Sequence, residues 1–405
     1  MKLDLVETAR QLVAIKSVNP MGNEAQGDEF LEGRLTRYLE TLFERLGLRH
    51  CRQAVLPGRE NIVARLDGDV RPEDGGRVIL FDAHQDTVRA EGMVIEPWNP
   101  LLRDGRLYGR GSCDTKGAMA AMIAAVARLA EELPAGMPTV MIACAVDEEQ
   151  AMSGMKRLPE LWSDEALGRA DSIFPCRPHA AIVGEPTGLQ IVVAHKGTVR
   201  WRCHTRGVAA HSAMPDHGQN AIYRMAEVLP LYARYQDEGV ADAPSHALCG
   251  GASLNVGLIQ GGTSVNTVPD LCTVVIDLRV PPSEDPRDAY RHVVDFIAKN
   301  SSLGFPIEHD EPHIVLRSMS DDKNGPISDM LLDATRQVVA GREKIGAVYT
   351  THAAQYAAAD VPAVVFGPGF IEQAHTVDEW LPLAQLQQAA EILYRFALET
   401  GRLPV

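Results

Sequence analysis

VILFDAHQDTV, residues 78–88, joins a predicted buried strand to a group of polar side chains. The apolar residues 78–81 are bulky and mostly branched or aromatic, which is typical of a strand in the interior of a sheet. Similar apolar runs occur at residues 62–66, 140–146 and 180–183. A helix of small residues is predicted over 116–133, between two of these runs. Strands that alternate with helices indicate an α/β fold, with a mostly parallel sheet covered by helices on both faces.

A different order of elements is predicted after residue 194. The elements there are a strand at 199–203, a helix at 220–235, strands at 252–259 and 271–280, a helix at 286–298 and a strand at 307–316. This β-α-β-β-α-β order is that of a small ferredoxin-like α+β domain. The alternating pattern then resumes. We therefore expect one domain over 1–194 and 317–405, with a second domain inserted at 195–316.

Composition and charge exclude several classes of protein. The chain has 405 residues, of which 45% are hydrophobic, and its formal net charge is −15. Nucleic acids and anionic membranes bind basic surfaces, so neither is an expected partner. Seven cysteines without CxxC spacing favour reduced thiols in the cytoplasm over a disulfide framework. Residues 1–18 read as an amphipathic helix rather than a signal peptide, and no apolar run is long enough to span a membrane.

Side chains that bind metal ions follow most of these apolar runs. The candidates, in chain order, are His84, Asp86, Asp114, Glu148, Glu149, Glu185 and His375. The carboxyl ends of parallel strands meet at one edge of a sheet, so these side chains are expected to converge. Imidazole and carboxylate groups are ligands of zinc, cobalt and manganese. The set predicts a site where two metal ions promote hydrolysis of an amide bond.

Different roles follow for these acids. Two cations close together repel each other, so a carboxylate shared between them is expected. Asp114 is the candidate, because it lies in a glycine-rich turn that can bend inward just before the predicted helix. Glu149 and Glu185 would neutralise further positive charge, as a buried centre requires. Glu148 is not needed as a ligand but is adjacent to Glu149, which is. It is therefore able to take a proton from water and deliver it to the leaving amine.

Each candidate also has a structural explanation that involves no metal. His84 could be a hydrogen-bonded histidine at a strand end, although Asp86 is placed to clamp its imidazole and fix its tautomer. Asp114 could be the N-cap of the following helix. The adjacent Glu148 and Glu149 could form a solvated loop. A single site accounts for the whole series, which separate explanations do not.

The chain resembles the zinc-dependent family of acetylornithine deacetylase, succinyl-diaminopimelate desuccinylase, aminoacylase and glutamate carboxypeptidase. The motifs that carry the resemblance extend over nearly the whole length, and are HQDTV, LYGRGSCDTKG, DEE, IVGEPTGLQIVVAHKG and GPGFIEQAHTVDEW. The resemblance is strongest to acetylornithine deacetylase. It implies a zinc-peptidase-like fold that holds one metal by His84, Asp114 and Glu185 and the other by Asp114, Glu149 and His375. It also implies that Glu148 is the general base, and that a cis peptide joins Asp114 to Thr115.

The resemblance extends to the inserted domain, which it identifies as a lid and dimerisation domain. His211, in GVAAHSAMPDHGQNAI, aligns with a histidine that stabilises the oxyanion of the tetrahedral intermediate, often from the partner subunit. Asn266 and Arg279 align with groups that hold the carboxylate of the substrate. The chain departs from the family at His352, where close relatives commonly have an acid. His352 is therefore a candidate for contact with the substrate.

These residues predict a metal-dependent hydrolase of an amide bond. The resemblance implies that the substrate is a small N-acyl amino acid, with N-acetylornithine as the leading candidate. Alternative substrates are succinyl-diaminopimelate, a general N-acyl amino acid, and a dipeptide or peptide. A scaffold that binds metal without catalysis is a further alternative, against which Glu148 beside a full ligand set argues. The expected cofactors are two Zn²⁺, for which Co²⁺ or Mn²⁺ could substitute. The expected partners are a small-molecule substrate and a second copy of the chain, bound through the inserted domain.

Overall fold

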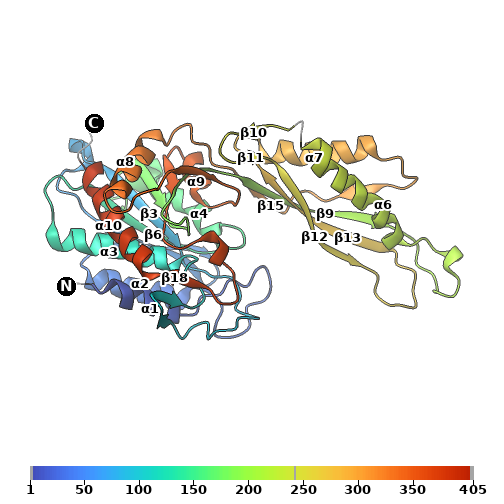
Figure 1. The fold of residues 1–405 in the computed structure, drawn as a ribbon, viewed down its shortest axis with the longest axis horizontal. Helices are drawn as coiled ribbons and strands as arrows, with labels where there is room; N and C mark the ends of the chain where they lie inside the picture. The colour runs from blue at the N-terminus through green and yellow to red at the C-terminus, as the bar shows by residue number, and fades with distance from the viewer. Residues whose placement is uncertain (1–2, 241–242, 402–405) are drawn as a thin grey trace. The chain divides into compact units, whose positions relative to one another are not determined.

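The main sheet has eight strands in the order β1-β2-β6-β3-β7-β17-β8-β16, of which β3 and β6 can be located in Figure 1. These strands are β1 (Arg49–Leu56), β2 (Arg59–Leu66), β3 (Val78–His84), β6 (Thr139–Ala145), β7 (Ala180–Val183), β8 (Ile191–His195), β16 (Lys344–Ala347) and β17 (Ala363–Val365). The central strands β6, β3, β7 and β17 are parallel to their neighbours within this group. Antiparallel pairs join β1 to β2, β2 to β6 and β8 to β17. The predicted α/β fold is confirmed, with antiparallel strands added toward the edges of the sheet.

The computed structural model describes residues 3–240 and 243–401. The chain divides into two compact units. The first unit comprises Met1–Val193, Asp321–Ile345 and Thr351–Val405, and the second comprises Ala194–Ser320 and Gly346–Thr350. The second unit is therefore built from one long segment of the chain and one short one.

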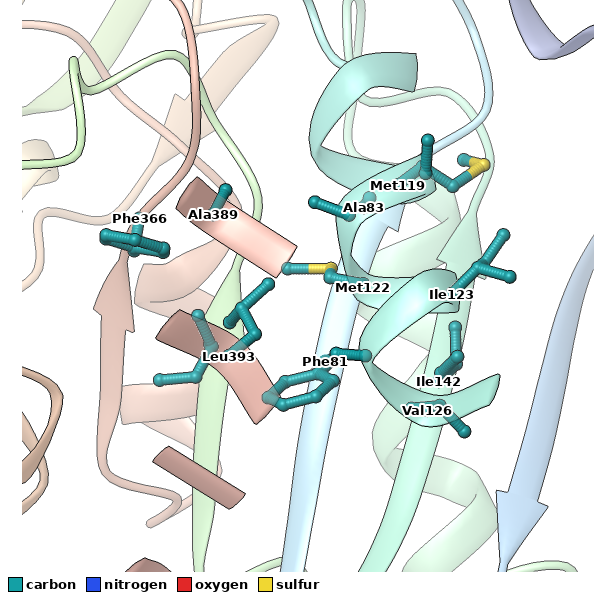
Figure 2. Packing of buried hydrophobic residues seen from close by; sticks show 14 of the residues in the cluster. Phe81, Ala83, Met119, Met122, Ile123, Val126, Ile142, Phe366, Ala389 and Leu393 are labelled. Carbon is teal, nitrogen blue, oxygen red and sulfur yellow. The ribbon is translucent and has the colours of Figure 1, made fainter. Parts of the chain in front are cut away.

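Helices cover both faces of the main sheet. The helices of the first unit are α1 (Leu5–Ala14), α2 (Gly33–Arg45), α3 (Lys116–Glu132), α4 (Ser153–Arg157), α5 (Asp164–Leu167), α8 (Gly325–Arg336), α9 (Ala353–Ala358) and α10 (Leu383–Thr400). On one face, Phe81 and Ile142 of the sheet belong to the same apolar core as α3 and Leu393 of α10 (Figure 2). Successive strand residues point to opposite faces, so Asp82 lies on the other side from Phe81. There the hydroxyl of Tyr356 in α9 donates to Asp82 Oδ2 over 2.7 Å.

A small three-stranded sheet links two distant parts of the first unit. It has the order β18-β5-β4, with β4 at Leu101–Arg103, β5 at Arg106–Tyr108 and β18 at Trp380–Pro382. Trp380 pairs with Tyr108 in an antiparallel register. The segment before α3 and the segment before α10 are therefore held side by side.

The second unit has a five-stranded antiparallel sheet in the order β12-β13-β9-β14, in which β15 also pairs with β9. Its elements are β9 (Gly197–Arg206), α6 (Ala221–Arg234), β10 (Ser245–His246), β11 (Gly250–Gly251), β12 (Ser253–Gly261), β13 (Leu271–Val280), α7 (Pro286–Asn300), β14 (Ile307–His309) and β15 (Ile314–Leu316). Alternate residues of β13, such as Val274 and Ile276, are buried in a core with Val228 of α6 and Val293 of α7. The predicted ferredoxin-like domain is confirmed.

Element boundaries differ from the sequence prediction in a few places. The strand predicted at 307–316 is two short strands, β14 and β15, which pair with different parts of β9. The helix predicted over 116–133 ends one residue earlier, because Leu133 has a φ of 42°. In the described part of the chain, no helix combines the length and apolar character that a membrane span requires.

Candidate metal centre

Four of the predicted ligands lie at or beyond the carboxyl ends of adjacent parallel strands. His84 ends β3, Glu149 follows β6, Glu185 follows β7, and His375 follows β17 after the short helix Ile371–Gln373. Because β6, β3, β7 and β17 are neighbours and parallel, these ends meet at one edge of the sheet. The topology therefore explains how residues so far apart in the sequence converge.

Asp114 lies between the two histidines. Its Oδ1 is 3.0 Å from His84 Nε2, and its Oδ2 is 3.2 Å from His375 Nε2. Asp114 follows β5 and precedes the cis peptide to Thr115 that was predicted. It is not the N-cap of α3, which is Thr115. Each oxygen of this carboxylate thus faces a different imidazole, as a shared ligand requires.

Each imidazole also faces one further acid. His84 Nε2 is 3.9 Å from Glu185 Oε1, and His375 Nε2 is 3.3 Å from Glu149 Oε2. The ligand atoms of His84, Asp114 and Glu149 all lie within 4.8 Å of one another. Ligand atoms on a tetrahedral zinc are roughly 3.3 Å apart. The contacts therefore form two sets that share Asp114.

The backbone fixes which nitrogen of His84 is available to a metal. His84 Nδ1 is 2.9 Å from the carbonyl oxygen of Asp86, which can only accept a hydrogen bond. Nδ1 therefore carries a proton, and Nε2 is the nitrogen that faces Asp114 and Glu185. Nε2 is thus the ring atom left for a metal ion, which would take the place of its proton.

The charge at the centre fits divalent cations. Burial raises the pKa of Glu185 well above its usual range, and the neighbouring charge of Asp114 raises it further. Burial alone would lower the pKa of His375, but its hydrogen bonds to Asp114 and Glu149 raise it to about 11. Glu149 Oε1 is buried without a hydrogen-bond partner. Carboxylates gathered in this way are costly unless positive charge compensates them, and cations bound here would supply it.

Asp86 has a different role from the one predicted. Its carboxylate Oδ1 is 3.7 Å from His84 Nδ1, so its backbone oxygen rather than its side chain clamps the imidazole. The carboxylate instead accepts the backbone N–H groups of Glu148 and Glu149, each over 3.1 Å. Asn19 Nδ2 also donates to it over 2.8 Å. Asp86 therefore holds the turn that carries Glu148.

Glu148 lies beside this cluster without belonging to either ligand set. Burial raises the pKa of its carboxyl well above the usual range, and the charge of Glu149 raises it further, whereas His84 lowers it. A carboxyl with a raised pKa holds a proton more readily near neutral pH. Its position and environment suit proton transfer.

A buried ion network behind the turn was not predicted from the sequence. Arg59 donates to Asp147 Oδ1 over 2.7 Å and to Glu32 Oε2 over 2.9 Å, and all three residues are buried. Asp147 has a left-handed φ of 64° and also accepts from Ser153. Asp147 precedes Glu148, so the network fixes one end of the same turn. An acid in the sequence DEE gives no sign of this burial, since runs of acids are usually solvated.

His352 is not placed as predicted. Its side chain is fully buried, its Nε2 is 3.2 Å from Asp82 Oδ2, and its ring meets that of His84 edge-on at 6.4 Å. A fully buried ring of this kind forms part of the wall behind His84. The expectation that His352 contacts the substrate is therefore replaced by one of a supporting position.

The second unit carries the predicted oxyanion residue His211 and the predicted substrate-binding residues Asn266 and Arg279. His211 is exposed, and its Nδ1 accepts the backbone N–H of Ala213 over 3.1 Å. Asn266 is also exposed, and its carbonyl accepts the N–H of Ser212 over 3.0 Å, so His211 and Asn266 stand on adjoining segments. Arg279 is half-buried, and its guanidinium donates to Asp277 and to Thr198.

Residues 80–399 match Peptidase family M20/M25/M40. The chain belongs to this family. Acetylornithine deacetylase of Myxococcus xanthus is 30% identical over 373 residues, which cover 89% of this chain and 90% of that protein. A probable carboxypeptidase of Ajellomyces dermatitidis is 33% identical over 352 residues, covering 82% and 73%. A probable succinyl-diaminopimelate desuccinylase of Staphylococcus aureus is 25% identical over 391 residues, covering 88% and 90%.

Solved structures of the family share the fold. A dipeptidase of Saccharomyces cerevisiae superposes with a TM-score of 0.78 at 14% identity, covering 99% of this chain and 96% of that one. A dinuclear metal-binding M20 peptidase of Bacillus subtilis superposes with a TM-score of 0.65 at 16% identity, covering 98% and 97%. Membership identifies the chain as a metal-dependent hydrolase of amides or peptides.

Proposed function

We propose that this enzyme uses two zinc ions to hydrolyse the amide bond of a small N-acyl amino acid, and that its leading activity is deacetylation of the N-acetylornithine type. The observation that carries the two-ion proposal is the position of Asp114, with one oxygen toward His84 and the other toward His375. The similarity to an acetylornithine deacetylase supports the choice of substrate.

The proposed ligands are His84, Asp114 and Glu185 for one ion and Asp114, Glu149 and His375 for the other. When bound, such a pair lowers the pKa of water and polarises the carbonyl of the substrate. Three carboxylates and two neutral imidazoles suit zinc, and also cobalt or manganese. The hydrogen bond from His84 Nδ1 to the carbonyl oxygen of Asp86 leaves Nε2 as the atom that can bind a metal ion, which supports the assignment of His84 as a ligand.

Glu148 is proposed to carry the proton. As a carboxylate it accepts a proton from the attacking water, and as a carboxylic acid it returns that proton to the nitrogen of the leaving amine. The products are a carboxylic acid and an amine, which together hold both hydrogens of the water, and the acid then passes its proton to the amine. The hydrogen bonds from Glu148 and Glu149 to Asp86 keep the carrier in place between the two transfers.

His211 is proposed to stabilise the oxyanion. Because Nδ1 of His211 accepts the N–H of Ala213, the neutral ring carries its proton on Nε2, which is then available as a donor. Asn266 and Arg279 are proposed to bind the carboxylate of the substrate. Arg279 already pairs with Asp277, so its guanidinium is held in a fixed orientation.

A panel of substrates tests the proposal. Purified protein loaded with zinc or cobalt would be assayed with N-acetylornithine, succinyl-diaminopimelate, neutral N-acetyl amino acids and dipeptides. We expect the highest kcat/KM with N-acetylornithine. A preference for the succinyl compound, for neutral acyl amino acids or for dipeptides would assign the enzyme to that alternative. No turnover of any amide by metal-loaded protein would contradict the proposed function.

We also propose that two copies associate through the second unit. β12 is an edge strand of its sheet and exposes Leu258 and Ile259 by 68% and 56%. Ile222 of α6 packs over Gly261 beside this edge, and Tyr223 is 72% exposed. A long apolar edge strand is prone to pair with another strand, and a second copy offers the same edge.

The mass of the protein in solution tests this association. Wild type should have the mass of two chains, and Leu258→Lys should shift it toward one. Val94→Lys, which changes an equally exposed apolar residue of the first unit, is the matched control and should remain a dimer. A monomeric wild type would contradict the association. Localisation in the cytoplasm is likewise a proposal, and it rests on the cysteine pattern of the sequence.

A further inference from the structure

Glu379 is a buried acid close to the candidate metal centre that belongs to neither ligand set. It lies four residues after His375 and directly before β18. Its carboxylate Oε1 accepts the backbone N–H groups of Cys113 over 2.8 Å and of Asp114 over 3.0 Å. Oε2 accepts the N–H of Gly111 over 3.0 Å. One side chain thus satisfies three amides of the turn that carries Asp114.

The turn has a shape that depends on this carboxylate. Gly111 has a left-handed φ of 82°, which directs neighbouring N–H groups toward one point and creates a concave anion site in the backbone. These amides are buried, and without an acceptor they would be costly. A Cβ at Gly111 would lie 2.8 Å from Thr87 Cγ2, so the turn has little room to rearrange. Glu379 therefore fixes the backbone from which the Asp114 carboxylate projects.

Arg110 extends the contact to the segment that carries His375. Its Nη1 donates to Glu379 Oε2 over 2.6 Å, and its Nη2 donates to the carbonyl of Thr376 over 3.3 Å. The N–H of Gly109 also donates to the carbonyl of Glu379 over 3.0 Å. Segments 109–114 and 375–379 are thus joined through Glu379 and Arg110.

We propose that Glu379 is a positioning residue for the metal site formed by Asp114, Glu149 and His375. This inference rests on the proposed function, because it assumes the two ligand sets. Two of the three ligands in that set stand on the segments that Glu379 joins. The other set, with His84 and Glu185, shares only Asp114 with them. Loss of the Glu379 carboxylate therefore weakens the binding of one ion more than the binding of the other.

Stepwise titration of the metal-free full chain with Co²⁺ tests the proposal without a substrate. Glu379→Gln keeps the shape of the side chain but turns an NH₂ group toward backbone donors. We expect one of the two dissociation constants to rise about 10–100-fold, as for other groups that orient metal ligands, and the other to change by less than about threefold. Where the enzyme turns over substrate, kcat should fall with little change in KM.

Two further variants complete the experiment. Glu132→Gln makes the same change on α3, where the partners Arg128 and Tyr394 lie outside the site, and it should leave both constants unchanged. Arg110→Lys keeps the charge but loses the pair of guanidinium hydrogen bonds that joins Glu379 to Thr376. It should raise the same dissociation constant as Glu379→Gln, by a smaller factor. If Glu379→Gln does not fold, Arg110→Lys tests the proposal in its place, again by whether one dissociation constant for Co²⁺ rises and the other does not.

The results separate this inference from the proposed function. Two unchanged constants in Glu379→Gln, or an equal rise in both, would overturn the positioning role. A wild type that binds fewer than two ions would overturn the proposed centre itself. A wild type that binds two ions but cleaves no amide would overturn only the proposed activity, and the effect of Glu379 would still be measured.

Discussion

Glu148 is held by Asp86, whose Oδ1 accepts the backbone N–H of Glu148 over 3.1 Å. Asp86 is fully buried, and its other oxygen accepts from Glu149 and from Asn19. A proposed ligand and the proposed proton carrier therefore share one anchor. Catalytic groups need such support, because a displacement of about 1 Å can lower the rate about 100-fold.

Replacing Glu148 should separate catalysis from metal binding. Glu148→Gln removes the proton carrier but leaves both ligand sets complete, so kcat should fall about 100–10,000-fold. The metal content, measured by atomic emission, should equal that of wild type. If the Glu148→Gln variant retained most of the activity, another group would have to transfer the proton.

Replacing Asp86 should lower the activity because Asp86 holds the turn that carries Glu148. Asp86→Ala leaves the N–H groups of Glu148 and Glu149 without their acceptor, and kcat should fall about 10–100-fold. Asp329→Ala is the control, because Asp329 pairs with Lys344 on the surface of the same unit. Steady-state kinetics of both variants would measure the effect. Equal rates in the two variants would contradict an anchoring role for Asp86.

Arg59 should matter for stability. Arg59→Met leaves the carboxylates of Glu32 and Asp147 buried without their cation, which should cost about 3–5 kcal/mol of unfolding free energy. Arg10→Met breaks an exposed ion pair with Glu7 and should cost at most about 1 kcal/mol. Urea denaturation at neutral pH compares the two. Similar losses in both variants would mean that the buried network contributes little.

The second unit should lose stability in mild acid because of His309. Burial, and to a smaller extent the charge of His204, together lower the pKa of His309 from 6.5 to about 4. The indole of Trp201 donates to Nδ1 of the neutral ring over 3.3 Å. Below pH 6.5 the unfolded chain binds a proton that the folded chain does not. The stabilisation is therefore complete above pH 6.5 and declines by roughly 3 kcal/mol as the pH falls to about 4.

Urea denaturation between pH 7.5 and pH 4.5 checks this dependence. His309→Gln removes the titrating group, so its unfolding free energy should decline less than that of wild type over the same range. Parallel declines in the two proteins would assign the acid sensitivity to other groups.

The positions of several proposed ligands follow from local sequence. His84 and Glu185 stand at or just beyond the ends of strands whose apolar runs are visible in the sequence. Once those strands are parallel neighbours, their ends must meet, so convergence needs no long-range information beyond the order of the sheet. The ferredoxin-like order of the second unit was predictable for the same reason.

Contacts between distant segments were not predictable. Glu379 follows an aspartate and precedes a tryptophan, and nothing local distinguishes it from a solvated acid. Its role appears only when residues 111–114, about 265 positions earlier, present their N–H groups to it. His352, at the N-cap of α9, likewise meets a distant residue, Asp82 of β3.

The sequence could not show which oxygen of Asp86, backbone or side chain, accepts the hydrogen bond from His84. The spacing of His84 and Asp86 predicted a clamp on the imidazole, and a clamp exists, but it is the backbone oxygen of Asp86. The carboxylate instead accepts the N–H groups of Glu148 and Glu149, which lie in the turn after β6. Which donor each oxygen of Asp86 accepts from is determined by the fold and not by the local sequence.

Anomalous diffraction from crystals grown with zinc is the most direct measurement of the bridging role of Asp114. Two zinc peaks about 3.5–4 Å apart should appear, as in other two-metal hydrolytic sites. Each should lie about 2.0–2.2 Å from a different oxygen of Asp114. A single peak, or two peaks of which Asp114 contacts only one, would contradict the two-ion centre.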